Sequence, residues 1–328
     1  MTDAQNPRYV SALEPQSVHS AEAAILDRGY RRYDGERRGT AGAMRSVMRA
    51  TFQAALGMHR KARYKVLPLL SIVLCYVPAT VFIGVLVLAN QAEERQRAGG
   101  LAPAGTVRAM AGTLVSDYPG LYQFIVAAVA LFTAFVAPEV LCTDRRTGMF
   151  ELYLASPLTR WTYLGAKAMA IGTLLSAVTL GPPLVMLIGY STQNFGPSSF
   201  TDWLLTLLRV LLVGGAISLF YTLLSAAVSS ITTRRTAASA VIALLIVGSG
   251  LISVFLREAL GVGSEWGAFD LFRLPSEFAY RVFGQPSPLR GFGNPVMESW
   301  LVYVSMCVWM LLSAAMVWIQ YRRAGVQR

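Results

Sequence analysis

The sequence has 328 residues, of which 54% are hydrophobic and 14% are charged, and its mean hydropathy is +0.48. Soluble domains carry about 25% charged residues, so this composition excludes a large soluble core and indicates an integral membrane protein. The net charge of +11 comes with basic residues that cluster beside apolar runs, which favours contact with membrane headgroups. No nucleic-acid recognition motif accompanies that charge, so nucleic acid is not an expected partner.

Residues 1–40 are polar, contain scattered arginines and lack an apolar period, so we expect a flexible cytoplasmic tail. They show no apolar core followed by a small-residue cleavage site, so no cleaved signal peptide is expected. Residues 41–65 predict an amphipathic helix that lies at the membrane interface, with its apolar positions at helical spacing. The basic residues of this segment that we expect to contact lipid phosphates are Arg45, Arg49, Arg60, Lys61 and Arg63.

Residues 66–320 contain apolar runs that are long enough to cross a hydrocarbon core of about 30 Å at 1.5 Å per residue. The runs cover residues 66–89, 119–137, 163–190, 203–229, 236–255 and 299–320. In the third run, the Gly-Pro-Pro sequence at 181–183 should kink the helix or end it early, because proline removes a backbone hydrogen bond. The sequence therefore predicts an all-α integral membrane protein with six transmembrane helices.

Lysine and arginine in the connections predict the orientation of these helices. The segment before the first run is rich in both, the link between the fourth and fifth runs carries Arg234 and Arg235, and residues 321–328 add three arginines. The connection at residues 191–202 has none. We therefore expect both termini on the cytoplasmic side of a bacterial-type inner membrane.

The segment at residues 256–298 is too rich in apolar side chains for an ordinary connector. A Pro-Ser-Glu sequence at 275–277 precedes the apolar residues 278–283, and Gly284 follows them, which is typical of a short helix. Two alternatives remain open for this segment. It forms amphipathic or re-entrant helices at the outer face, or it is an extracytoplasmic cap that only packs on the bundle.

No motif for catalysis or metal binding is present. The chain lacks a phosphate-binding G-x-x-x-x-G-K-[ST] loop, a G-x-S-x-G elbow and an H-E-x-x-H helix, and its three cysteines and two histidines lack ligand spacing. We therefore predict no catalytic residue, no metal and no cofactor bound by this chain. Arg209 is the only charge well inside a predicted span, and snorkelling or a structural pair is the simpler role, with substrate contact as the alternative.

One polar-to-amphipathic stretch lies between two closely spaced apolar runs. Thr143 and Asp144 can cap the start of a short helix there and place negative charge near its positive end. Pro157 disfavours helical geometry just before it, so the helix should stop near Ser156, which can then cap a new helix. The stretch is thus predicted to form a short helix (about 143–156), a rigid corner and a helix continuous with the third span.

The acid, basic pair, glycine and glutamate of this stretch, followed by Pro and Arg and then by Gly165 and Lys167, resemble the cytoplasmic signature of ABC-2 type transporter permeases. Asp144 stands where glutamate is common in that signature. The resemblance extends over the interface helix, the six spans and the helical segment before the last one, and it leaves residues 1–40 unexplained. It implies that the residues coupling the chain to an ATPase are Asp144, Arg145, Arg146, Gly148, Glu151, Leu152, Pro157 and Arg160.

The resemblance also implies partners and a function. A separate ABC ATPase subunit would hold ATP and Mg²⁺, a second permease copy or a paralogue would complete the path, and spans two and five would line it. The expected role is a permease subunit of an exporter for a lipophilic substrate such as a drug, lipid or glycolipid. The alternatives are a membrane-integral enzyme, for which no polar catalytic group at membrane depth is found, an ion-gradient-driven carrier, and a non-transporting membrane anchor.

Overall fold

A computed structural model of the chain describes residues 39–58, 65–99, 117–146, 158–232, 234–260, 263–287 and 297–323. These residues all belong to one compact unit, Arg38–Arg328. The predicted N-terminal tail lies outside the described residues, apart from its last two, which are the first residues of a helix.

Within the described ranges, six helices are long and apolar enough to cross a membrane, which confirms the predicted all-α, six-span architecture. These spans are formed by α3 (Val66–Gly99), α5 with α6 (Tyr118–Phe135 and Ala137–Arg146), α8 (Arg160–Thr192), α9 (Phe200–Ile231), α10 (Arg235–Leu260) and α12 (Ser299–Arg323). Three shorter elements accompany them: α2 (Gly39–Ala55), the 3-10 helix η2 (Ser264–Phe269) and α11 (Leu274–Phe283).

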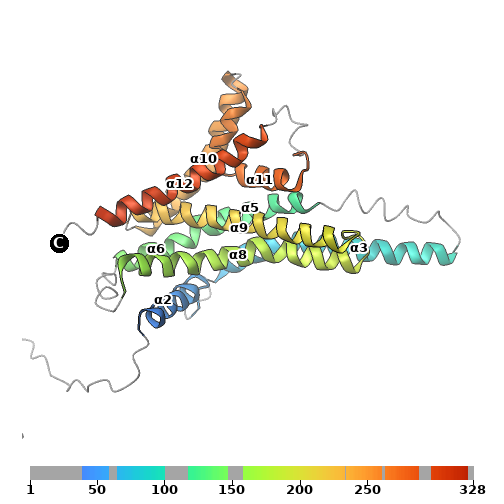
Figure 1. The fold of residues 1–328 in the computed structure, drawn as a ribbon, viewed down its shortest axis with the longest axis horizontal. Coiled ribbons are helices and arrows are strands. Elements are labelled where there is room, and N and C mark those ends of the chain that lie inside the picture. The colour runs from blue at the N-terminus through green and yellow to red at the C-terminus, as the bar shows by residue number, and fades with distance from the viewer. Residues whose placement is uncertain are drawn as a thin grey trace, which may run out of the picture. The chain divides into compact units, whose positions relative to one another are not determined.

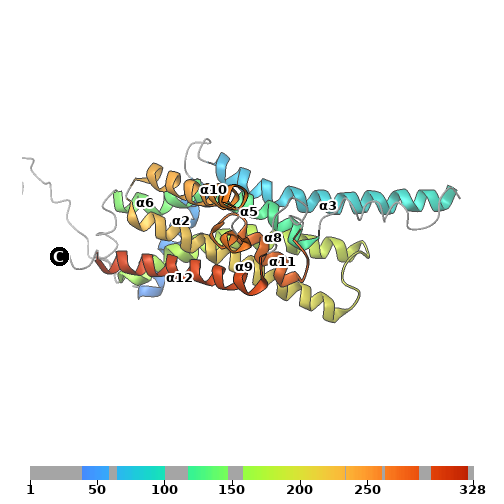
Figure 2. The same ribbon diagram turned by 90° about the horizontal axis from the view of Figure 1, so that it is seen from above.

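The helices α8 and α9 lie side by side, with α3 and α5 packed against α8 and with α12 packed against α9 (Figures 1 and 2). At one end of the bundle, α2 contacts α8 and α6 (Figure 1). Exposed basic side chains gather at this end, which we call the basic end: Arg45, Arg49, Lys65, Arg234 and Arg235. At the opposite end, α3 projects beyond α8 and α9 (Figure 2).

Small and hydroxylated residues allow α8 and α9 to approach closely. A Cβ atom on Gly214 would lie 2.4 Å from a methyl carbon of Leu180 and 3.1 Å from the Thr179 carbonyl oxygen, so a side chain there would force Leu180 to shift. The Thr179 hydroxyl donates to the Gly214 carbonyl at 2.8 Å, and the Ser176 hydroxyl donates to that of Ser218 at 3.0 Å. Close packing and interhelical hydrogen bonds hold spans together where water is absent.

The helix α2 has a buried face formed by Val47, Thr51 and Ala55, while Arg45 and Arg49 are exposed. Val47 packs against Tyr163 at the start of α8, with Met44 beside them. Part of the apolar face of this helix therefore packs against protein. Its position in the plane of the membrane interface stays a prediction.

Of the two effects predicted for the Gly-Pro-Pro sequence, a kink or an early end of the third span, the early end is wrong, because α8 continues through Pro182 and Pro183 to Thr192. Both prolines are buried, and the backbone one turn before them receives a hydrogen bond from a neighbouring helix. The Tyr76 hydroxyl on α3 donates to the Ala177 carbonyl at 3.1 Å. This hydrogen bond joins α3 to α8 a few residues before the two prolines.

Three predicted helix boundaries also need correction. The first span continues to Gly99, ten residues past the apolar run, because residues 91–98 are good helix formers. Thr143 and Asp144 do not start a helix, since they lie inside α6, which begins at Ala137.

The predicted start of α8 at Ser156 and Pro157 is wrong as well. Those two residues lie outside the described ranges, but the next two are not helical and α8 begins at Arg160. Thr159 is its cap: its hydroxyl accepts from the Thr162 N–H, and the Thr162 hydroxyl accepts from the Thr159 N–H. This reciprocal pair satisfies donors that a helix start leaves free, and it moves the start three residues along the chain.

Candidate functional site

The eight predicted coupling residues are only partly described. Asp144, Arg145 and Arg146 form the end of the α6 backbone, and Arg160 is the half-buried first residue of α8. Outside the described ranges lie Gly148, Glu151, Leu152 and Pro157, and so do the interface residues Arg60, Lys61 and Arg63. The roles of all these residues stay predictions, and the structure defines instead how α6 is held.

Lys167 joins α6 to α8. Its ammonium group donates to the Val140 carbonyl of α6 at 2.9 Å and lies 5.3 Å from the centre of the Tyr163 ring. The side chain is only 3% exposed. A buried ammonium is costly unless its donors are used, so this contact fixes α6 against α8.

Two further contacts join α6 to other spans. The Cys142 thiol lies 3.6 Å from the Thr232 carbonyl at the end of α9, within the range of a weak sulfur hydrogen bond. Glu139 accepts a hydrogen bond from the Arg235 guanidinium, at the start of α10, at 3.0 Å. The short helix α6 is therefore connected by side chains to three different spans.

At the opposite end of α10, the chain turns back into the bundle. The Leu271 N–H donates to the Ser249 hydroxyl at 3.1 Å, and the Leu271 carbonyl accepts from the Tyr221 hydroxyl at 3.3 Å. Ser249 lies about 21 Å along α10 from its first residue, at 1.5 Å per residue. The helix α10 extends beyond Ser249 to Leu260, and the chain then returns to the depth of Ser249 at Leu271. This geometry favours re-entrant helices over an outer cap.

We call Ser264–Phe283, which contains η2 and α11, the re-entrant segment. The presence of α11 confirms the predicted short helix, and the observed helix is one turn longer than predicted. Pro275 lies in its first turn, and Gly284 ends it with a φ of 70°, a left-handed conformation that favours glycine. Phe283 stacks on Tyr118 of α5, with ring centres 5.7 Å apart. The end of α11 is thus beside the first turn of α5.

A buried ionic network holds α11 together. Glu277 is 2% exposed and accepts hydrogen bonds from the Arg273 guanidinium at 3.1 and 3.2 Å and from the Ser287 hydroxyl at 2.7 Å. The Arg281 guanidinium lies 3.7 Å from its second oxygen. Burial, with smaller effects of the Glu277 and Asp117 carboxylates, raises the pKa of the Tyr280 phenol to about 12, so this phenol is neutral at physiological pH.

A cavity of about 540 Å³ lies between α5, α10 and this re-entrant segment. Its apolar wall consists of Val126, Val247, Leu251, Val254 and Phe272, with Gly250 among them. Its polar groups are Gln123, Asp270, Arg273 and Ser276. The Gln123 amide makes no hydrogen bond with any residue in the described part of the chain. The cavity can therefore bind a largely apolar molecule and offer hydrogen bonds to its polar part.

A comparison with protein families decides what kind of membrane protein this is. The model of the ABC-2 family transporter protein matches residues 108–319, which is well over half of the chain. The chain belongs to the ABC-2 transporter family. It is therefore a multi-pass membrane protein of the ABC-2 permease type, as the motif around residues 144–167 had indicated. A search among curated proteins found no match.

Arg209 of the permease lies on the exposed side of α9, beside the exposed Leu205, Leu208 and Leu212. Its guanidinium makes no hydrogen bond or ion pair with the residues that the structure describes. The structural pair that we had considered for Arg209 is therefore not found among them, and its position on an exposed face favours snorkelling.

Three features of the permease site were not predicted from sequence: the Glu139–Arg235 ion pair, the Lys167 contact with Val140, and the amide of Gln123 in the cavity. The first two join residues far apart in the chain, which no local pattern indicates. Gln123 did carry a signal, since it is an isolated amide inside the apolar run of α5. Polar residues inside spans are functional candidates.

Proposed function

We propose that this ABC-2 permease is the membrane subunit of an ATP-driven exporter, and that a separate ABC ATPase subunit holds ATP and Mg²⁺. The observation that carries this proposal is the attachment of α6 to α8, α9 and α10 through Lys167, Cys142 and Glu139. The last residues of α6 and several residues that follow it are those that the family resemblance assigns to ATPase contact. Because α6 is joined to three spans, a displacement of the contact segment by the ATPase is transmitted to all of them.

The cavity between α5 and α10 supports a substrate path along these two spans, completed by a second permease copy or a paralogue. Its wall is apolar, and its polar groups are confined to Gln123 and the re-entrant segment. Such a lining suits an amphipathic or lipophilic substrate, for example a drug, lipid or glycolipid. We propose that this substrate leaves the cytoplasm or the inner leaflet, with both termini of the permease on the cytoplasmic side of an inner membrane.

One observation favours an ion-gradient-driven carrier as a second candidate. Asp270 and Glu277 are buried carboxylates near membrane depth, which proton-coupled carriers use. Glu277, however, is engaged by two guanidinium groups, an arrangement that suits a fixed structural charge. Transport that survives ATP depletion but stops when the ion gradient is dissipated would favour the carrier.

Co-purification with a candidate ABC ATPase tests the exporter proposal. Glu151→Lys should reduce the amount of ATPase recovered with the permease by about tenfold or more, since unpairing a charge in an interface costs about 2 kcal/mol or more. Glu94→Lys is the matched control, because Glu94 is an exposed carboxylate on the projecting end of α3, and it should have no effect.

Equal recovery of the ATPase with both variants would remove Glu151 from the contact. If no ABC ATPase binds the unaltered permease, the exporter proposal fails and the carrier or a non-transporting anchor takes its place.

A further inference from the structure

The cavity of about 540 Å³ between α5, α10 and the re-entrant segment, here called the α5–α10 cavity, has two kinds of wall. Val247, Leu251 and Val254 of α10 are 59%, 67% and 42% exposed, and they face lipid because they lie on a membrane span. Asp270 and Ser276 of the re-entrant segment are 4% and 8% exposed. A ligand that enters from the lipid therefore meets the polar wall with its leading end, while its apolar part stays beside α10.

The cavity lies near the membrane surface opposite the basic end. Gln123 is five residues after Tyr118, about 7.5 Å along α5 from the first residue of that helix, at 1.5 Å per residue. Leu251 is about 24 Å along α10 from Arg235, which is at the basic end. The polar part of a membrane lipid can therefore reach the cavity from the nearby headgroup layer while its acyl chains remain in the hydrocarbon.

Gln123 provides a polar group in this cavity that the protein itself does not use. Its side chain is half-buried and lines the cavity, and its amide makes no hydrogen bond with any residue in the described part of the chain. The amide carries two N–H donors and a carbonyl acceptor. Because a polar group in apolar surroundings is costly unless it is hydrogen-bonded, the amide favours a ligand group that both donates and accepts.

The re-entrant segment adds a donor and an acceptor. The Arg273 guanidinium donates to Glu277 through Nε at 3.2 Å and Nη2 at 3.1 Å, while its Nη1 makes no hydrogen bond with the residues that the structure describes. The Ser276 hydroxyl donates to the Arg273 carbonyl at 2.7 Å, so its oxygen is left to accept. Asp270 accepts from the N–H groups of Phe272 and Arg273 at 3.1 and 2.9 Å, which fixes this turn. A ligand therefore meets donors and acceptors that are held in place on one side of the cavity.

An aromatic ring lies on the same wall. Phe272 lines the cavity next to Arg273 and is 41% exposed. The face of an aromatic ring carries partial negative charge. The C–H groups of a sugar ring carry partial positive charge and can pack on such a face, whereas the hydroxyl groups around the sugar ring both donate and accept hydrogen bonds.

We propose, on the basis of the exporter function above, that the α5–α10 cavity binds the sugar headgroup of a glycolipid. Hydroxyl groups of the sugar pair with the Gln123 amide, the Arg273 Nη1 and the Ser276 oxygen. A face of the sugar ring packs on Phe272, and an acyl chain lies along Val254. The substrate class of the proposed path is then a glycolipid, rather than a drug or a phospholipid.

Hydrogen-bond balance distinguishes a sugar from other lipid headgroups. Phosphocholine has oxygen acceptors but no N–H or O–H donor, so it would leave the Gln123 carbonyl and the Ser276 oxygen without a donor. Diacylglycerol offers a single hydroxyl and would leave most of the polar wall unpaired. Buried polar groups that lose water without gaining a partner weaken binding, so both lipids should bind less well than a glycolipid with the same acyl chains.

Native mass spectrometry of the full-length permease tests this proposal. The protein is purified in a polyoxyethylene detergent, since alkyl glycosides would themselves occupy the site, and is equilibrated with equal amounts of monoglucosyl diacylglycerol, phosphatidylcholine and diacylglycerol of identical acyl chains. We expect the glucosyl lipid to be retained about tenfold over either competitor, and Gln123→Leu to abolish this preference. Gln91→Leu is the matched control, since Gln91 is exposed on the projecting end of α3 and does not line the cavity.

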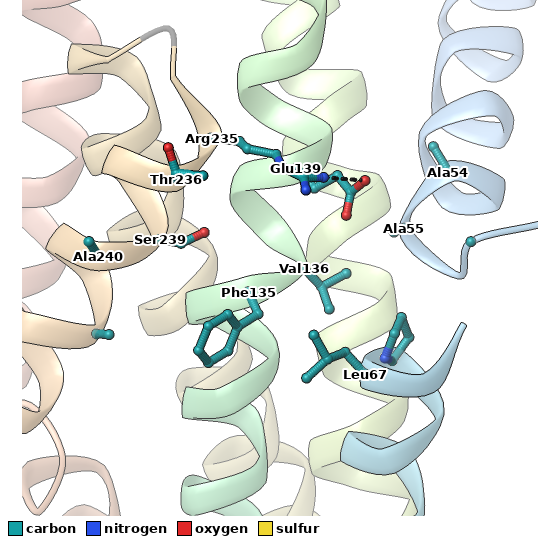
Figure 3. Close-up of a pocket in the computed structure, with 13 residues that line it drawn as sticks. Ala54, Ala55, Leu67, Phe135, Val136, Glu139, Arg235, Thr236, Ser239 and Ala240 are labelled. Atoms are coloured by element: carbon teal, nitrogen blue, oxygen red, sulfur yellow. Dashed lines mark hydrogen bonds and ion pairs between the residues drawn. The ribbon is translucent and has the colours of Figure 1, made fainter. Parts of the chain in front are cut away.

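A second pair of variants leaves every polar group of the site intact. Val254→Trp should fill the α5–α10 cavity and displace the glucosyl lipid, while the fold remains because Val254 is exposed. Its control is Ala240→Trp, about 21 Å away along α10, which fills a separate cavity of about 790 Å³ at the basic end (Figure 3). The two cavities share no lining residue, so Ala240→Trp should leave the preference unchanged.

Equal retention of the three lipids by the unaltered protein would overturn the proposal, and so would a preference that survives both Gln123→Leu and Val254→Trp. An equal loss of preference in Val254→Trp and Ala240→Trp would place the lipid elsewhere. Displacement by free glucose at equal concentration would also overturn the proposal, because the acyl chain would then contribute nothing. Retention is measured without an ATPase, so a preference for the glucosyl lipid in a permease that binds no ATPase would leave this site in place and remove only the exporter.

Discussion

Lys167 connects α8 to α6 through a buried side-chain contact. In Lys167→Met, a side chain of similar length loses the donor to the Val140 carbonyl and the cation beside the Tyr163 ring. Hydrogen bonds made by charged groups contribute about 1.5–3 kcal/mol, so the free energy of unfolding should fall by about 2 kcal/mol. Hydrogen–deuterium exchange should become faster in α6 and stay unchanged in α12.

The control for this prediction is Arg209→Met, which also removes a basic side chain from a span. Because Arg209 is exposed and makes no polar contact with the described residues, its replacement should change the free energy of unfolding by less than about 0.5 kcal/mol. Unaltered exchange in α6 of Lys167→Met would mean that other contacts hold this helix.

Glu277 is a buried carboxylate that lies between two guanidinium groups. Glu277→Gln keeps the shape of the side chain but leaves both arginines without their counter-charge, which should cost about 3–5 kcal/mol and lower the melting temperature. A double-mutant cycle with Arg281→Gln measures the interaction free energy between the Glu277 and Arg281 side chains. The double variant should be more stable than the sum of the single losses by about 0.5–3 kcal/mol, and strict additivity would show that Arg281 does not depend on Glu277.

At the scale of elements, the fit between α3 and α8 depends on Gly181. A Cβ atom there would lie 1.8 Å from the Tyr76 hydroxyl oxygen, so Gly181→Ala must displace the ring that donates to the Ala177 carbonyl. Overpacking of this kind costs about 1–3 kcal/mol, which denaturation in detergent should detect.

Gly165→Ala on the same helix is the control. Its Cβ would have no neighbour within 4 Å, so the substitution should be neutral or raise stability by up to about 1 kcal/mol. An equal loss in both variants would contradict the role of Tyr76.

The same elements show what the sequence could and could not predict. The six spans and α11 follow from apolar runs and from a proline before and a glycine after, because both signals are local. The ends of helices were predicted less well: reciprocal capping by Thr159 and Thr162 places the start of α8 later than expected, and α8 continues through its two buried prolines. The candidate site depends on residues more than 90 positions apart, such as Glu139 and Arg235, and their meeting is decided by helix packing that no period in the sequence encodes.

At the scale of the whole molecule, the distribution of charge predicts which end faces the cytoplasm. The basic end carries α2 and the short α9–α10 link with Arg234 and Arg235, whereas residues 191–202 between α8 and α9 contain no lysine or arginine. Basic connections stay in the cytoplasm, so Ser198→Cys should react with a membrane-impermeant maleimide in intact cells, and Ala50→Cys on α2 only after permeabilisation. Both positions are exposed, and Cys307→Ser removes the one exposed cysteine within the described ranges from the background. The reverse labelling pattern would place the basic end outside the cell. Labelling of both positions in intact cells would place α2 and the α8–α9 connection on the same side of the membrane. This would contradict the fold, because an odd number of spans separates them.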